Sequence, residues 1–152
     1  MRRLLFLSLF LVASPALAQA PGITVPADTL IAARQSNFLL SEGTFMGMKN
    51  AIADKEDVTV WADAAGFLAN WAGTLPSLFP PGTEKGHDTK ALAAVWTDRA
   101  GFEKAATRYG DAAKKLQAAA KSGDKAAFAA AFKETGKACG ACHKKFRQKD
   151  ED

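Results

Sequence analysis

The sequence predicts an all-α protein, an antiparallel four-helix bundle with up-down-up-down topology. Beyond its first twenty residues the chain is rich in Ala, Lys, Leu, Glu and Gln, all of which favour helices. Apolar residues recur there at alternating steps of three and four, the spacing of one helix face. The breaks between these stretches are mostly short, and short connections favour antiparallel neighbours.

An export signal is predicted at the N-terminus. Arg2 and Arg3 precede an apolar run over residues 4–12, and small residues follow over positions 16–20. A positive end, a short apolar core and a small-residue cleavage site form a secretory signal peptide. We expect a signal of residues 1–18 or 1–20, a single mature domain over residues 21–152, and a periplasmic location. An uncleaved membrane anchor is the alternative, although the run is short for a bilayer span.

Charge and hydropathy argue against two classes of partner. The chain has 20 basic and 16 acidic residues, and two of the basic ones, Arg2 and Arg3, belong to the predicted signal. The remaining basic excess is too small to indicate nucleic-acid binding. No second stretch is apolar enough to span a bilayer. We therefore expect neither nucleic acid nor, after cleavage, a membrane as a partner.

The first two helices are predicted from their apolar stripes. The first spans about residues 26–52, and the second begins after Asp57, a suitable N-cap. Pro76 predicts a kink or an early stop near the end of the second helix. The inner face of the first helix would comprise Ala27, Ile31, Arg34, Phe38, Ser41, Phe45, Met48 and Ile52, and that of the second Trp61, Ala64, Leu68, Trp71, Leu75 and Leu78.

A segment rich in Pro and Gly, residues 79–87, separates the second helix from the third. We expect the third helix to begin at about Asp88 and to end at residues 122–124, which also cap the fourth. The fourth helix would run to about Lys149. Its inner face would comprise Phe128, Phe132, Thr135, Cys139, Cys142 and Phe146.

The fourth helix carries Cys139-Gly-Ala-Cys142-His143, the attachment signature of c-type haem. Two thiols one helical turn apart can each add to a vinyl group on the same porphyrin edge. The adjacent imidazole of His143 then reaches the iron from one side. We therefore predict one covalently attached haem c, with His143 as the axial metal ligand. Both cysteines lie on the inner face, so the haem should lie inside the bundle.

Other readings of this cysteine pair explain less. A disulfide between adjacent helical turns would constrain the fold very little. A closed structural zinc site needs four ligands, whereas the only other histidine is His87 in a distant loop. A thioredoxin-like redox pair would be expected beside a strand, and the sequence indicates none.

Antiparallel topology predicts which residues lie opposite His143. The end of the fourth helix should lie beside the first part of the first helix, so residues from Arg34 to Phe38 should face the iron. Arg34 either extends to the end of the bundle to reach water or pairs with a haem propionate, and Gln35 could support the same propionate. Phe38 offers no lone pair to iron. Met46 and Met48 lie about 12–15 Å further along the helix.

These residues, taken together, resemble the cytochrome c′ family, the high-spin four-helix class of c-type cytochromes. The resemblance covers essentially the whole mature chain. It rests on Arg34-Gln-Ser36, on the loop from Phe79 to Glu84 with Trp96 after it, and on the terminal block from Cys139 to Arg147. That block matches the family pattern Cys-x-x-Cys-His-x-x-Tyr/Phe-Arg.

The resemblance implies a five-coordinate iron with His143 on its proximal side and an apolar distal pocket. It implies that Arg34 and Gln35 contact the propionates, that Phe38 blocks the distal side, and that Arg147 lies near the haem on the proximal side. Family members bind nitric oxide and carbon monoxide, discriminate against oxygen, and are often homodimers through the first two helices. Many members have Leu at the position of Phe38.

Two functions from different classes remain open at this point. The first is a gas-binding haem protein, concerned with nitric oxide binding or detoxification. The second is an electron carrier of the same fold with a methionine as sixth ligand and an unidentified redox partner. Phe38 in the matching region favours the first. We expect no enzymatic activity, because a peroxidase would need a distal acid–base residue and none is visible near Phe38.

Overall fold

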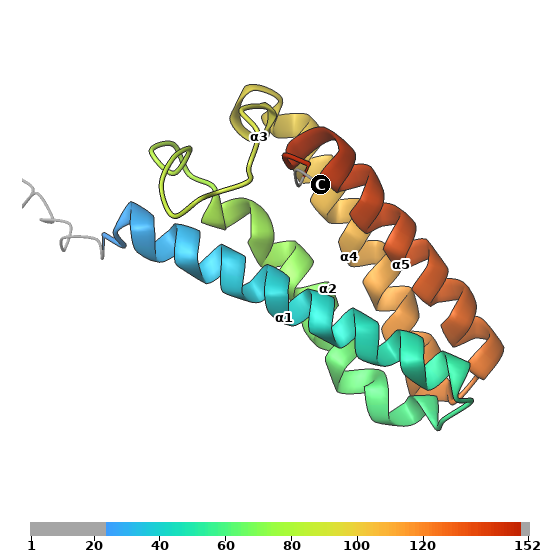
Figure 1. The fold of residues 1–152 in the computed structure, drawn as a ribbon. Coiled ribbons are helices and arrows are strands. Elements are labelled where there is room, and N and C mark those ends of the chain that lie inside the picture. Colours follow the sequence, from blue (N-terminus) through green and yellow to red (C-terminus); the bar gives the residue numbers. More distant parts are fainter. Residues whose placement is uncertain (1–23, 150–152) are drawn as a thin grey trace, which may run out of the picture.

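The structure is a computed structural model that describes residues 24–149, so the predicted signal peptide lies outside the described residues. Four long helices dominate it: α1 (Ala27–Ala53), α2 (Ala62–Thr74), α4 (Arg99–Ser122) and α5 (Lys125–Phe146). A single turn, α3 (Ala94–Thr97), precedes α4, and short 3-10 turns (Val58–Trp61 and Leu75–Leu78) flank α2. The predicted four-helix bundle is confirmed (Figure 1).

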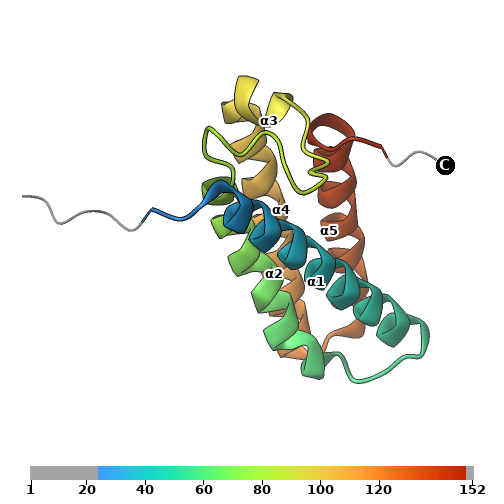
Figure 2. The same ribbon diagram turned by 60° about the vertical axis from the view of Figure 1, so that its left-hand side comes forward.

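The helices are antiparallel to their neighbours, but they do not pack equally closely. The α4 helix packs along its length against both α2 and α5, whereas α1 makes far fewer contacts with the bundle. At one end of α1 the Phe45 ring stacks directly on Phe132 of α5, with 4.0 Å between ring centroids. Toward its other end α1 diverges from α5 in both ribbon views (Figures 1 and 2). The bundle is therefore open at the end where α1 begins.

Aspartate caps set where three of the helical segments begin. The carboxylates of Asp57, Asp98 and Asp124 accept hydrogen bonds from backbone N–H groups in the first turns of the Val58–Trp61 turn, α4 and α5. Gly123 ends α4 in the left-handed conformation, with φ of 70°. The predicted cap after residue 57 and the predicted boundary at residues 122–124 are confirmed. Pro76 ends α2 in a 3-10 turn, as expected.

The predicted start of the third helix is wrong. A helix from about Asp88 was expected, but the backbone of His87 and Asp88 has positive φ, and the first long helix after the loop is α4 at Arg99. The Asp98 cap fixes this start. The residues between the loop and α4 instead cover the open end of the bundle.

This covering segment, residues 79–93, lies between the start of α1 and the end of α5. It pairs with the residues after α5 through an antiparallel bridge between Ala91 and Arg147. The backbone N–H of Leu92 donates to the carbonyl oxygen of Phe146 at 3.0 Å. Figures 1 and 2 show the segment crossing the end of the bundle beside the start of α1. Within residues 24–149, none of the helices combines the length and apolar character needed to cross a bilayer.

Candidate functional site

A cavity of about 570 Å³ lies at the open end of the bundle, between α1, α2, α4, α5 and the covering segment. Its size is within the range of about 300–1,000 Å³ that cofactor sites occupy. Its lining is mostly apolar and aromatic. It includes all seven residues that the sequence singled out, Arg34, Gln35, Phe38, Cys139, Cys142, His143 and Arg147.

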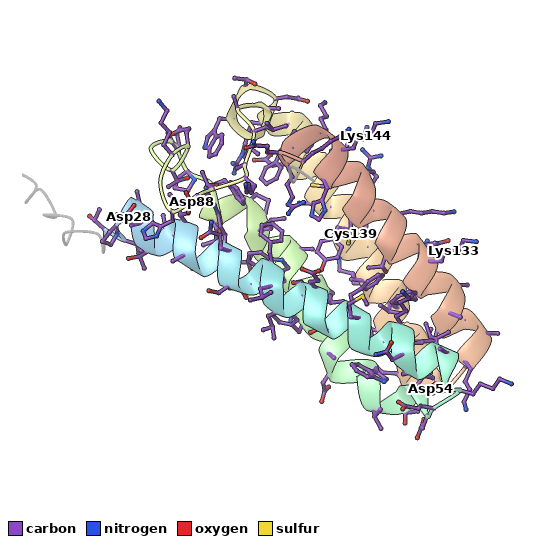
Figure 3. The ribbon with its side chains drawn as sticks, in the orientation of Figure 1. Asp28, Asp54, Asp88, Lys133, Cys139 and Lys144 are labelled. Carbon is purple, nitrogen blue, oxygen red and sulfur yellow. The ribbon has the colours of Figure 1, made fainter. Side chains whose placement is uncertain are left out.

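The cysteines of α5 lie at the cavity wall as free thiols. Figure 3 shows Cys139 on the side of α5 that is turned toward α1, whereas Lys133 and Lys144 project from the outer side. Burial raises the pKa of the Cys139 thiol to about 11, with a further contribution from the charge of Cys142. Burial also raises the pKa of Cys142. Both thiols are therefore harder to ionise than a cysteine in water.

The zinc site considered above needs groups beyond this pair of cysteines, because a closed structural zinc site needs four ligands. Among residues 24–149, no group of three or more His, Cys, Asp or Glu side chains is placed to hold a metal ion. The two sulfurs form no disulfide. The structure thus gives no support to a zinc site or to a structural disulfide.

Phe38 lies opposite His143 across the cavity. The two ring centroids are 6.4 Å apart and the rings are inclined at 71°. The Phe38 ring also makes an edge contact with Trp71 of α2, at 5.4 Å and 84°. The antiparallel register that was expected to place the first part of α1 against the end of α5 is confirmed by this pairing.

Arg34 is buried, with only 1% of its surface exposed. Its terminal nitrogens donate to the carbonyl oxygens of Leu78 and Thr83 and to the hydroxyls of Thr83 and Thr89, at 2.8 to 3.2 Å. The guanidinium also lies 4.1 Å from the centroid of the Phe79 ring. The alternative in which Arg34 extends into water is therefore wrong. Instead, the side chain holds the covering segment against α1.

Burial lowers the pKa of Arg34, and the carboxylate of Glu84 acts in the opposite direction. An arginine keeps its charge in proteins, so a cation is fixed at this end of the cavity. Gln35 supports the same junction, because its side-chain amide donates to the carbonyl oxygen of His87 at 2.6 Å. Arg147 lines the cavity beside the bridge that its backbone forms with Ala91.

Sequence reasoning missed several polar groups in the cavity wall, among them the hydroxyls of Ser41 and Tyr109 and the indole of Trp71. Burial raises the pKa of Tyr109, as does the charge of Cys139, while a hydrogen bond with Ser41 acts in the opposite direction. Ser41 and Trp71 lie on stripes that were assigned to packing. A signal for Tyr109 and Trp71 was available, because a buried Tyr or Trp carries a polar group that needs a partner.

Neither methionine of α1 lines the cavity. Met48 is fully buried in the core at the closed end of the bundle, and Met46 is 47% exposed. His87 lies at the surface, where its imidazole is 3.6 Å from the carboxylate of Asp28. The distance argument that excluded these three side chains from the iron thus agrees with their positions.

The residues of this cavity fit a covalently bound haem. Two thiols one turn apart and the adjacent imidazole lie along one wall, and the guanidinium of Arg34 lies at one end. Apolar and aromatic side chains supply most of the remaining surface. Such a group would be held by Cys139, Cys142 and His143, and it would supply an iron centre able to bind small ligands or to carry an electron.

Comparison with known proteins agrees with this assignment. The cytochrome c′ family model matches residues 29–147. Cytochrome c′ of Rubrivivax gelatinosus is 43% identical over 119 residues, which cover 76% of this chain and 92% of the relative. The crystal structure of cytochrome c′ from Rubrivivax gelatinosus aligns with a TM-score of 0.74 at 40% identity, covering 80% of this chain and 97% of the other.

A further similar structure is the nitric oxide complex of the L16A mutant of cytochrome c′ from Alcaligenes xylosoxidans. It aligns with a TM-score of 0.75 at 28% identity, covering 84% of this chain and all of the other. The match of the family model, the bundle and the cavity around Cys139, Cys142 and His143 lead to one conclusion. The chain belongs to the cytochrome c′ family of haem proteins and carries covalently bound haem c.

Proposed function

We propose that this chain is a periplasmic haem protein that binds nitric oxide and carbon monoxide at a five-coordinate iron and acts in nitric oxide binding or detoxification. In this proposal Cys139 and Cys142 hold the haem and His143 is the only protein ligand of the iron. One observation carries it: the side chain opposite His143 is the phenyl ring of Phe38, which cannot ligate iron. Among the described residues, no methionine and no second histidine lines the cavity.

Relatives support the choice of ligand. Several similar structures are described as nitric oxide complexes of cytochrome c′ from Alcaligenes xylosoxidans. A neutral diatomic gas can enter an apolar pocket without losing much hydration. The role is one of ligand binding rather than catalysis, because the ring of Phe38 cannot transfer a proton as a distal acid–base group would.

The remaining site residues have roles in the same proposal. The cation of Arg34 pairs with a haem propionate, Gln35 supports that contact, and Arg147 lies near the haem on the side of His143. The predicted signal peptide directs the chain to the periplasm, where haem is attached. Mass spectrometry of the protein from the periplasmic fraction tests this, because the mature chain should begin after Ala18 or Ala20 and carry one haem.

We also propose that two copies associate through α1. Its outer side exposes Leu39, Leu40 and Met46, at 71%, 57% and 47%. Gly43 lies among them with nothing within 4 Å of the position a Cβ would take. Exposed apolar side chains gathered on one helix face are typical of a protein interface.

Optical spectra of the ferric and ferrous holoprotein test the main proposal. We expect a high-spin ferrous spectrum at neutral pH, and nitric oxide and carbon monoxide should each bind without displacing a side chain. Met46→Ala and Met48→Ala should leave the spectrum unchanged. A low-spin ferrous spectrum that either substitution converts to high spin would instead establish the electron-carrier alternative.

Phe38 gives a kinetic test of the same proposal. Phe38→Ala removes the ring from the face opposite His143, and with it aromatic contacts worth about 0.5–1.5 kcal/mol each. Carbon monoxide association, followed by flash photolysis, should accelerate by roughly tenfold while the ferrous spin state is unchanged. Lys49→Ala is the control, an exposed residue of α1 outside the cavity wall and outside the proposed interface, and should leave the rate as in the wild type.

A further inference from the structure

Trp71 presents a buried hydrogen-bond donor that the protein does not satisfy. The residue is 4% exposed, and its indole Nε1 has no hydrogen-bond partner among residues 24–149. Leaving a buried N–H without an acceptor is costly, and such groups in native proteins call for an explanation. Trp61 has the same property at its own Nε1, but it does not line the cavity. Trp71 does line the cavity, although the Nε1 atom itself is covered in this arrangement of its neighbours.

The position of Trp71 along the cavity is set by Phe38. The Phe38 ring contacts Trp71 on one side, at 5.4 Å between centroids, and His143 on the other, at 6.4 Å. These contacts bring α1, α2 and α5 together at one level of the bundle. Trp71 therefore lies at the same height in the bundle as the imidazole of His143, and the Phe38 ring contacts both of them.

A propionate is the less suitable acceptor. The guanidinium of Arg34, the cation suited to a propionate, bonds to Leu78 and Thr83 at the end of the bundle. Leu78 lies seven residues beyond Trp71, and α2 and its 3-10 extension advance about 10 Å over that distance. The indole of Trp71 and the guanidinium of Arg34 thus lie at different heights along the cavity.

We propose that the Trp71 indole N–H is the hydrogen-bond donor of the distal pocket, and that it recognises small ligands on the iron whose outer atom carries negative charge. The inference rests on the ligand-binding function proposed above. It adds a hydrogen-bond donor on the α2 wall to a distal pocket that was expected to be apolar.

Phe38 controls access to this donor. Its ring contacts both Trp71 and His143, so a ligand opposite the imidazole must first displace the ring. The displacement removes the ring contact with Trp71 and frees the indole to turn toward the ligand. Its N–H has no partner beforehand, so an acceptor atom on the ligand supplies the missing hydrogen bond. Ligands that offer no acceptor gain nothing from it.

Vibrational spectroscopy of the ferrous protein with bound carbon monoxide tests the proposal. A hydrogen-bond donor near the outer atom lowers the C–O stretching frequency, so Trp71→Phe should raise it. The affinity of the ferric protein for cyanide, an anion, should fall by about tenfold in the same variant. Trp61→Phe is the matched control, because it also removes a buried indole N–H that has no partner, away from the cavity.

The wild type supplies a measurement that needs no variant at the site. The Trp71 N–H should shift in the ultraviolet resonance Raman spectrum, toward stronger hydrogen bonding, when carbon monoxide or cyanide binds, and this shift should persist in Trp61→Phe. Carbon monoxide that binds with the same stretch in all three proteins would overturn the role of Trp71 and leave the proposed function intact. A six-coordinate, low-spin ferrous protein before ligand addition would instead overturn the proposed function itself.

Discussion

Arg34 shows how a single buried charge is stabilised by distant parts of the chain. The sequence places it on the inner face of a helix, where an unpaired charge would be expensive. In the structure, its partners come from residues 44 to 55 positions away in sequence. That the residue is buried could be predicted from helical spacing, but its partners could not. They depend on where an irregular loop folds back.

Replacing Arg34 should affect both the loop and the haem. Arg34→Leu removes four hydrogen bonds to residues 78–89 and a cation near the proposed propionate. We expect the free energy of unfolding to fall by about 3 kcal/mol. The redox potential and its pH dependence should also change. Denaturant unfolding and potentiometry measure these effects.

Arg34→Lys is the informative companion. It keeps the charge and cannot reproduce the forked hydrogen bonds. The potential should stay nearer to the wild-type value while the loss of stability persists. If Arg34→Leu leaves the potential and the spectrum unchanged, Arg34 has only its structural role.

The cysteines give the most direct chemical prediction at this scale. Thioether bonds to Cys139 and Cys142 should resist acidified acetone, which extracts haem that is not covalently bound. Cys139→Ala and Cys142→Ala should each weaken or abolish attachment, as judged by the mass of the isolated protein and by haem staining after denaturing electrophoresis. Clean extraction of haem from the wild-type protein would contradict the proposed attachment.

At the scale of helices, the spacing of apolar residues predicted the helix bounds correctly where a helix has one buried face and a capping residue. The extent of α1 and the boundary between α4 and α5 follow from their stripes and caps. The predicted end of the fourth helix at about Lys149 is wrong, because α5 ends at Phe146 and Arg147 is extended in its bridge with Ala91.

The prediction for the segment before α4 is wrong because Leu92 and Val95 have the spacing of a helical stripe, although they belong to a loop and to the single turn α3. What ends the helical pattern there is the backbone at His87 and Asp88 and the cap at Asp98, which tertiary contacts determine.

Asp98 connects two elements beside the haem-binding segment. Its carboxylate caps α4 and pairs with Lys145 of α5. These hydrogen bonds, from Lys145 first and then from the backbone of Gly101, lower the pKa of Asp98. A lowered carboxylate pKa in the folded state means that its stabilising contribution is present above about pH 4, the usual range of aspartate, and is lost as the pH falls further.

Asp98→Ala should therefore lower the melting temperature by a few degrees at pH 7. The difference from the wild type should disappear as the pH falls below about 4. Calorimetry over a pH series measures this. Asp124→Ala is the matched control, because Asp124 also caps a helix but lies at the far end of the bundle. Only Asp98→Ala should also perturb the haem spectrum, because its partner Lys145 lies two residues from His143.

At the scale of the whole molecule, α1 is the least integrated of the four long helices. It stacks on α5 at the closed end and is tied to the covering segment at the other. Its outer side is the surface proposed for association. Helical spacing already places Leu39 and Leu40 off the predicted inner face, but whether another element covers them depends on where the neighbouring helices lie.

A single charge on the outer face of α1 tests the proposed association of two copies. Leu40→Glu should convert a dimer to a monomer, because a charge on the apolar face would be desolvated at the interface. Sedimentation equilibrium of the holoprotein measures the change. Leu92→Glu is the matched control, because Leu92 is also exposed, at 39%, but lies outside α1. A wild-type protein that sediments as a monomer at all accessible concentrations would exclude the interface.

The two walls of the cavity come from opposite ends of the chain. Phe38 and His143 face each other across more than a hundred residues of sequence, whereas the two thiols and the imidazole lie within five. Long-range pairings form slowly and local ones quickly. Attachment chemistry therefore needs only a short stretch near the C-terminus, whereas closure of the cavity needs the whole chain. Haem can therefore be attached before the bundle has folded, and it then provides an apolar surface on which α1 docks last.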